Sequence, residues 1–333
     1  MAAARLPGRA ATRVRYREME PVPHPGGLRS MTSSFFLCGG TAWDGDGAFL
    51  RLAEPGGAAA FLRLAPGTEL RFRNRSEARR YCLGYELVRE DGRTSHPCPD
   101  QACAERGYQC RRCFFQDEGR LVHNSHRGGD LPAGLRSFLA RPQWLYIATF
   151  ADGTTKVGTA ADRRKVLRLT EQGALAAQYV ARADNGIRVR VLEDTLSSAL
   201  GLTQAVRSGH KCAALSAPLP SATLEAINAG HADAARTVLF DLGQDGFEVV
   251  KESWGRPREF DAVLQNYGAG VYPLPLTAGE HGLVLRGVLG STALAGTDDA
   301  GLDFLADLTS LKGQRLELGD YSTSLPALQE PLF

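Results

Sequence analysis

The sequence predicts an α+β fold with three parts: a β-rich module, a cysteine knuckle and a compact core of strands and helices. Short strand patterns separated by Gly and Pro fill residues 31–95 and return over residues 270–320. Five of the seven cysteines lie within residues 82–113. Residues 141–205 alternate between strand and helix patterns, which completes a mixed architecture with one β-rich and one α/β part.

These patterns divide the chain into five regions. Residues 1–30 contain mainly Arg, Ala, Pro and Gly without periodicity, and we expect them to be disordered. The β-rich N-terminal region covers residues 31–95, and the knuckle with a linker covers residues 96–140. The core follows over residues 141–205, and residues 206–333 form a mixed α/β region that ends in strands.

The elements of the terminal regions follow from apolar periodicity and from Gly or Pro turns. Strands are predicted over residues 34–38, 48–52, 60–64, 69–73, 81–89, 270–274, 282–288, 291–295 and 315–318. Helices are predicted over residues 222–229 and 232–242. The two β regions could pack together as one module, a point that the sequence leaves open.

The core begins with a β-hairpin. Residues 144–150 are rich in Trp, Leu, Tyr, Ile and Phe, as buried strands are. The Asp152-Gly153 pair predicts a turn into a second strand over residues 155–159. The remaining elements are a helix over residues 162–172 ended by Gly173, a strand over residues 174–183, and a helix to residue 200 ended by Gly201.

This order of elements can place Tyr146, Arg168 and Glu193 at one concave surface, a set that suits phosphodiester hydrolysis. Glu193 would hold Mg²⁺ or Mn²⁺ through oxygen, Arg168 would balance charge on phosphorus, and Tyr146 would orient or deprotonate water. Each residue also has a structural interpretation. A strand Tyr is usually core, Arg168 lies in a charged run typical of a solvated helix face, and Glu193 beside Asp194 is typical of a surface.

The segments Leu145-Tyr-Ile-Ala148, Lys156-Val-Gly-Thr159 and Glu171-Gln-Gly-Ala174, together with Arg168 and Glu193, resemble the GIY-YIG nuclease superfamily. More specifically, the chain is similar to a bacterial and archaeal family of unknown function in which a diverged core of this kind follows a cysteine cluster. The resemblance implies an antiparallel three-stranded sheet with helices. It also implies that Tyr146 and Gly158 belong to the two motifs, that Arg168 is the helical Arg, and that Glu193 binds the metal.

Lys156 departs from the pattern, because the superfamily has a second Tyr at this place. Its ammonium could contact phosphate, which suits binding as well as cleavage, so Lys156 joins Tyr146, Arg168 and Glu193 as a candidate catalytic residue. The predicted function is metal-dependent phosphodiester hydrolysis on DNA or RNA, as by an endonuclease. The alternative is a non-catalytic, zinc-containing nucleic-acid-binding protein, and a third hypothesis is a zinc-stabilised interaction scaffold.

The cysteines predict a structural zinc site. Cys110-Arg-Arg-Cys113 is a C-x2-C pair, whose two thiolates can bind one tetrahedral ion from a single turn. Cys82 and Cys98 would complete a closed set of four ligands. Three further residues, Cys103, His123 and His126, could replace one ligand. Disulfides and a redox pair are the alternatives, and we expect Cys38 and Cys212 to be ordinary buried residues.

Composition sets the remaining expectations. The 333 residues suffice for a sizeable core, and no apolar run is long enough for a membrane span, so we expect a cytoplasmic location without a membrane partner. The net charge is only +2. Local clusters that could follow a phosphate backbone are Arg71, Arg73, Arg75, Arg79 and Arg80, and Arg106, Arg111 and Arg112 beside the cysteines.

Overall fold

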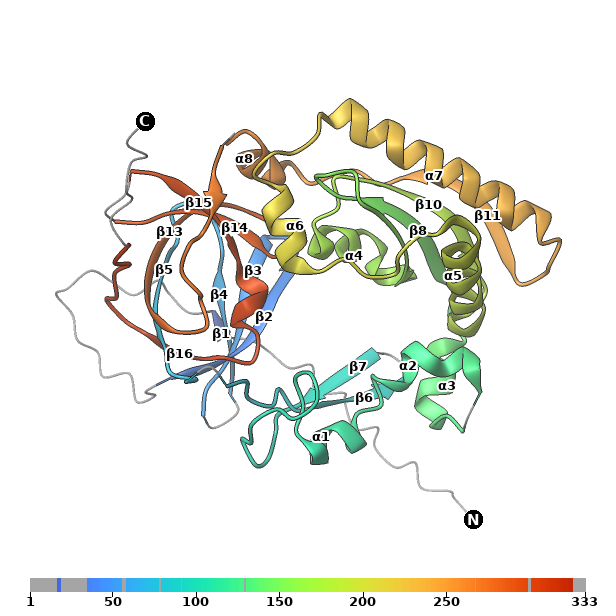
Figure 1. The fold of residues 1–333 in the computed structure, drawn as a ribbon. Helices are drawn as coiled ribbons and strands as arrows, with labels where there is room; N and C mark the ends of the chain where they lie inside the picture. The colour runs from blue at the N-terminus through green and yellow to red at the C-terminus, as the bar shows by residue number, and fades with distance from the viewer. Residues whose placement is uncertain are drawn as a thin grey trace, which may run out of the picture.

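The structure, a computed structural model, describes residues 17–18, 35–55, 58–77, 79–90, 92–128, 130–266, 268–298 and 301–325. A β module (35–77 and 268–325), a cysteine module (79–140) and a core (141–266) are arranged around a shared centre (Figure 1). Arg17–Glu18 forms strand β1, which pairs in parallel with β4, so the prediction of disorder is wrong there. The rest of residues 1–30 lies outside the described residues.

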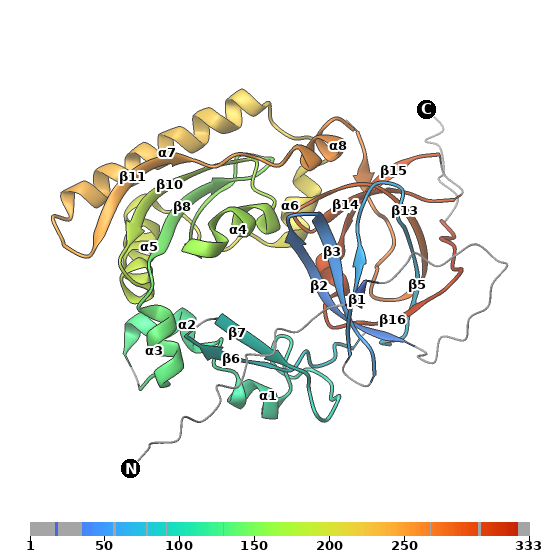
Figure 2. The same cartoon turned by 180° about the vertical axis from the view of Figure 1, so that it is seen from behind.

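The β module joins both ends of the chain in one ten-stranded sheet of order β1-β4-β3-β2-β16-β5-β13-β14-β15-β12. The sheet is strongly curved, as Figures 1 and 2 show. Its N-terminal strands are β2 (Phe36–Asp44), β3 (Gly47–Ala53), β4 (Ala59–Arg63) and β5 (Glu69–Asn74). Its C-terminal strands are β12 (Gly270–Val271), β13 (Gly279–Leu289), β14 (Thr292–Gly296), β15 (Asp303–Asp307) and β16 (Arg315–Leu318). Alternate residues of β3 are buried, as the two-residue period of a strand requires.

The core contains a four-stranded antiparallel sheet of order β11-β10-β8-β9. Strands β8 (Gln143–Thr149), β9 (Thr155–Ala161) and β10 (Ala176–Ala183) match the predicted strands. The expectation of three strands is wrong, because β11 (Phe247–Ser253) adds a fourth at the edge beside β10. This edge strand has mostly exposed side chains and therefore shows little apolar periodicity.

Helices cover both faces of the core sheet. Helices α5 (Gly186–Leu200) and α7 (Ser221–Asp241) pack on the face that carries Leu145 and Ile147. The opposite face carries Tyr146 and Ala148, against which α4 (Lys165–Gln172) packs after the short 3-10 turn Asp162–Arg164. Because α4 lies on the side of the β module, β8 is buried on both faces. Helix α7 is continuous, so the predicted break near residue 230 is wrong.

The core and the β module share one hydrophobic cluster, which extends from Leu50 and Phe72 to Phe150 and Leu169. Gly173, at the end of α4, and Gly290, in the β13–β14 turn, approach so closely that a Cβ on Gly290 would lie 2.7 Å from Gly173. Between the two parts lie the short elements α6 (Ser208–Ala214), α8 (Asp261–Leu264) and the 3-10 turns Arg258–Phe260 and Leu308–Leu311. These contacts fix the core against the β module.

The cysteine module carries a separate hairpin of β6 (Tyr85–Arg89) and β7 (Gly92–His96). Its helices are α1 (Arg111–Gln116), α2 (Leu121–Asn124) and α3 (Ala133–Leu139), with the 3-10 turn Ser125–Arg127. A small cluster around Val88, Val122, Leu135 and Leu139 holds the hairpin to α2 and α3. Among the described residues, every helix is too short or too polar to cross a membrane.

Candidate functional site

Tyr146 and Gly158 face each other across β8 and β9, and the ring of Tyr146 occupies the space that a side chain at residue 158 would need. A Cβ on Gly158 would lie 2.5 Å from the Tyr146 hydroxyl and 2.6 Å from Cζ. The glycine is therefore required by close approach of the ring, since its own φ is ordinary. The structure thus gives a physical reason for a glycine opposite Tyr146.

The hydroxyl of Tyr146 is buried but points toward polar groups. Gln172 Nε2 donates to it at 2.8 Å, and Gln172 lies one helical turn after Arg168 on α4. Burial raises the pKa of Tyr146, and the nearby Glu193 adds to that effect while Arg168 opposes it. The phenol is therefore neutral near pH 7, so it can donate or accept a hydrogen bond but does not act as a phenolate base.

Lys156 is buried, with 6 % of its surface exposed. The edge of β9 is covered at this point, because Lys156 and Val157 pair with Thr203 of the segment after α5. The ammonium lies 5.8 Å from the centre of the Tyr146 ring. Burial and the neighbouring charge of Arg168 lower the pKa of Lys156 to about 8.

Glu193 is also buried, contrary to its interpretation as a surface residue, and it is already paired. Arg190, one turn earlier on α5, donates to Glu193 Oε2 at 2.6 Å. No group of three or more His, Cys, Asp or Glu ligand atoms surrounds Glu193 in the part of the chain that the structure describes. A divalent cation would thus have one protein carboxylate here, which Mg²⁺ accepts when water and substrate phosphate complete the shell.

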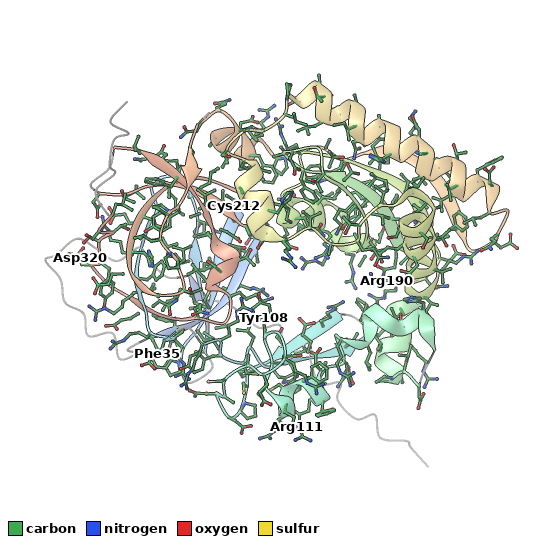
Figure 3. The ribbon with its side chains drawn as sticks, viewed as in Figure 1. Phe35, Tyr108, Arg111, Arg190, Cys212 and Asp320 are labelled. Carbon is green, nitrogen blue, oxygen red and sulfur yellow. The ribbon has the colours of Figure 1, made fainter. Side chains whose placement is uncertain are left out.

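The charges of Arg168, Arg190 and Lys211 all act on the buried ammonium of Lys156, and we call Lys156, Arg168, Arg190 and Lys211 the cation cluster. Arg168 is exposed on α4, as its interpretation as a helix-face residue predicts, and its charge still reaches the buried Tyr146 and Lys156. Lys211 of α6 donates to the carbonyl oxygen of Gln172 at 2.8 Å, and burial lowers its pKa to about 8. Figure 3 shows Arg190 on the side of the core that faces the cysteine module.

The structure therefore brings together all four sequence-predicted residues of the core and adds three that the sequence analysis missed. Arg190 and Gln172 could have been found, because they lie three and four positions from Glu193 and Arg168 on the same helix faces. Lys211 offered no such signal. It reaches the site only because α6 packs against the β module and returns toward the end of α4.

The second candidate site is a metal centre in the cysteine module. The Sγ atoms of Cys82, Cys98, Cys110 and Cys113 all lie within 4.8 Å of one another, and all four residues are buried. Cys98 Sγ and Cys110 Sγ are 3.9 Å apart. A tetrahedral zinc with four thiolates has sulfur–sulfur edges of about 3.8 Å, so the arrangement fits a bound metal ion. Burial raises the pKa of Cys82, and the N–H of Gly84, which points at Cys82 Sγ at 3.4 Å, opposes that effect in part.

The alternative ligands do not join this centre. Cys103 is exposed and lies outside the cluster of four. His126 Nε2 instead contacts Asp194 Oδ2 at 3.0 Å, a contact that ties the cysteine module to α5 of the core. The side chain of His123 lies outside the described residues. Cys38 and Cys212 are buried and apart from the cluster, as expected.

The arginines of β5 and Arg75, which follows it, are paired with carboxylates, and this weakens the expectation that they follow a phosphate backbone. Arg71 pairs with Asp298 at 2.7 Å and with Glu69 at 2.8 Å. Arg73 pairs with Glu280, and Arg75 pairs with Glu317. In the core, Glu193 pairs with one member of the cation cluster, Arg190.

Comparison of the chain with models of known protein families, with curated proteins and with solved structures finds no match.

Proposed function

We propose that the core binds the phosphodiester backbone of DNA or RNA at the cation cluster. One observation carries this proposal: the positive charges of Arg168, Arg190 and Lys211 act on the buried Lys156, while the carboxylate of Glu193 is already paired with Arg190. Buried like charges lower one another's pKa values and destabilise the fold. A phosphate group would relieve that repulsion, which makes an anion the ligand that best fits the site.

Hydrolysis is a second candidate function, and the lowered pKa of Lys156 favours it. A lysine with a pKa of about 8 can accept a proton near neutral pH, so Lys156 could take the part of the missing second Tyr. Arg168 would balance charge on phosphorus, and Glu193 would hold Mg²⁺ or Mn²⁺ after release from Arg190. We propose zinc for the four-cysteine centre, in a structural role, because a closed set of thiolates has no open position for substrate.

Binding is tested by fluorescence anisotropy with labelled single-stranded and duplex DNA and RNA in the presence of EDTA. Lys156→Ala should weaken binding about tenfold, since one buried cation in contact with phosphate is lost. Lys251→Ala is the matched control, because Lys251 is exposed on β11 of the same sheet. Equal affinity of Lys156→Ala and wild type, with both folded, would contradict the proposal.

Hydrolysis is tested by a cleavage screen over the same nucleic acids with Mg²⁺ and Mn²⁺. Glu193→Gln should abolish turnover, whereas Arg168→Ala should lower the rate by roughly 10²–10³-fold, as expected for one electrostatic donor. Tyr146→Phe retains the ring above Gly158, so lost activity at an unchanged Tm would assign a role to the hydroxyl. If wild-type protein binds nucleic acid but does not cleave it, hydrolysis is contradicted and binding alone is the function.

A further inference from the structure

A cavity of about 970 Å³ lies between the β module and the cysteine module. One wall comes from β2 and β3, including Gly39 and Arg51, and another comes from the segments around Tyr81 and Tyr108. Figure 3 places Tyr108 where the cysteine module meets the β module. None of the candidate residues of the core lines this cavity. Its volume is that of a site for a small organic ligand.

Three cations on its walls have no carboxylate partner. Arg51 Nη2 donates to the carbonyl oxygen of Gly39 at 2.9 Å, and its Nε is buried without a hydrogen-bond partner. The ammonium of Lys312 lies 4.4 Å from the centre of the Tyr108 ring. Arg315 donates to the carbonyl oxygen of Gln101 at 3.3 Å. No ion pair joins these three side chains to a carboxylate in the described ranges of the chain.

The acidic residues of the cavity offset this positive charge only in part, with Glu86 close enough to raise the pKa of Lys312. Glu86 pairs with Arg93 at 3.1 Å. Asp117 accepts hydrogen bonds from the backbone N–H groups of Glu86 and Arg120. Among the described residues, Glu54 is the one acidic residue of the cavity wall whose side chain makes neither an ion pair nor a hydrogen bond. The cavity therefore favours an anionic ligand.

Aromatic rings stand beside the cations. The guanidinium of Arg315 lies 3.5 Å from the centre of the Tyr81 ring and 4.8 Å from that of Phe35. Tyr85 and His96 are stacked in parallel, with ring centres 5.0 Å apart. Aromatic faces next to unpaired cations are the two features by which proteins hold the bases and phosphates of unpaired nucleotides.

We propose that this cavity binds a nucleotide, with the phosphate held by Arg51 and Lys312 and the base held against the aromatic side chains of the same walls. The ligand class agrees with the proposed function, but the residues are different ones, so this site and the cation cluster can fail independently. The bound nucleotide can be part of a single strand of nucleic acid or a free nucleotide from solution. Cys82 and Cys98 also line the cavity, so an ordered metal centre would fix one of its walls.

The experiment compares full-length wild type with Lys312→Ala, Tyr108→Ala, Lys156→Ala and the control Lys251→Ala. The probes are a labelled oligothymidylate of about ten nucleotides, the length of one single-strand site, and AMP. Lys312→Ala and Tyr108→Ala should each weaken single-strand binding about tenfold, the effect of losing one stacked base or one phosphate contact. If wild-type protein binds AMP and the same variants bind it more weakly, the ligand is a free nucleotide. If the variants lose affinity for the oligothymidylate and AMP does not bind, the ligand is a single strand of nucleic acid.

Photocrosslinking keeps the proposal testable if a variant does not fold. Wild-type protein is irradiated with a strand that carries 5-iodouridine, and the crosslinked peptides are mapped by mass spectrometry. Crosslinks at Tyr81, Tyr85 or Tyr108 are expected. The proposal is overturned if crosslinks occur only in the core, or if folded Lys312→Ala and Tyr108→Ala bind both probes as wild type does. If Lys312→Ala weakens binding of the oligothymidylate and Lys156→Ala does not, the result contradicts the proposed function and still supports a nucleotide site in this cavity.

Discussion

At the residue scale, Gly158 makes the most specific prediction about the core. Gly158→Ala places a Cβ 2.5 Å from the Tyr146 hydroxyl, and the ring of Tyr146 is fully buried. The free energy of unfolding should fall by about 1–3 kcal/mol, as for other overpacked interiors. Urea unfolding measures it. Gly230→Ala is the control: it lies in α7 with no atom within 4 Å of an added Cβ and should stabilise the protein slightly. Equal behaviour of the two variants would contradict the packing described here.

Lys156 should make the protein less stable than it would be with an apolar residue. Its pKa is about 8 in the folded state against 10.5 in the unfolded state, so the folded state disfavours the charged form. Lys156→Met should therefore raise the free energy of unfolding at pH 7 by on the order of 1–3 kcal/mol. The gain should shrink as the pH rises from 8 to 10.5, because the unfolded lysine then also loses its proton. No gain at pH 7 in urea unfolding would show that Lys156 is not buried as a charged group.

The same residue separates binding from catalysis by the sign of the pH dependence. Phosphate binding needs charged Lys156 and Lys211, whose pKa values are both about 8, so affinity should fall as the pH rises through that value. Hydrolysis with Lys156 as the base would instead accelerate over the same range. Anisotropy and cleavage measured from pH 6.5 to about 9.5 give both curves. Lys156→Arg should flatten the binding curve, since an arginine does not titrate there. Affinity that rises with pH would exclude phosphate contact by these lysines.

At the element scale, the cysteine module should depend on its metal ion. The purified protein should contain one metal ion per chain, because the free energy with which four thiolates bind the ion contributes directly to the free energy of folding. Cys113→Ser should lower the metal content and the Tm, whereas the exposed Cys103→Ser should change neither. Elemental analysis and thiol titration measure the result. Four freely titratable thiols at positions 82, 98, 110 and 113 in native protein would contradict a metal centre.

Elements that depend on local patterns were predictable from the sequence, and those that depend on distant partners were not. The core strands β8, β9 and β10 follow from apolar composition and from the Asp152-Gly153 turn. Strand β7 contains Gly, Arg, Thr, Ser and His, so no apolar period marks it and only pairing with β6 makes it a strand. Strand β11 pairs with β10 across more than sixty residues of chain. Helix α7 continues through Gly230 because packing of Ala232 and Ala235 outweighs the local preference.

The candidate sites were also predictable from the sequence only where they depend on local patterns. The four cysteines were identifiable from spacing and residue type. Tyr146, Lys156, Arg168 and Glu193 were identifiable as a set, but the burial of Lys156 and Glu193 was not, since it depends on Thr203 and Arg190. The cavity between the two modules was not predictable either. Its walls come from residues more than two hundred positions apart, such as Arg51 and Arg315.

At the scale of the whole molecule, both cationic sites lie where the parts of the chain meet. The β module and the core share one hydrophobic cluster, and His126 with Asp194 joins the cysteine module to the core. The cation cluster belongs to the core and to α6 beside it, and the cavity lies between the β module and the cysteine module. A single strand bound at both sites would contact all three parts.

The central claim is that the cation cluster binds nucleic-acid phosphate, and the salt dependence of binding tests it most directly. The affinity of wild type and of Lys156→Ala/Lys211→Ala for one single-stranded oligonucleotide is measured over a range of salt concentrations without divalent metal. Each lost phosphate contact lowers the slope of log affinity against log salt by about one. We therefore predict a slope shallower by about two in the double variant and an unchanged slope in Lys251→Ala. A folded double variant with the wild-type slope and affinity would contradict the claim.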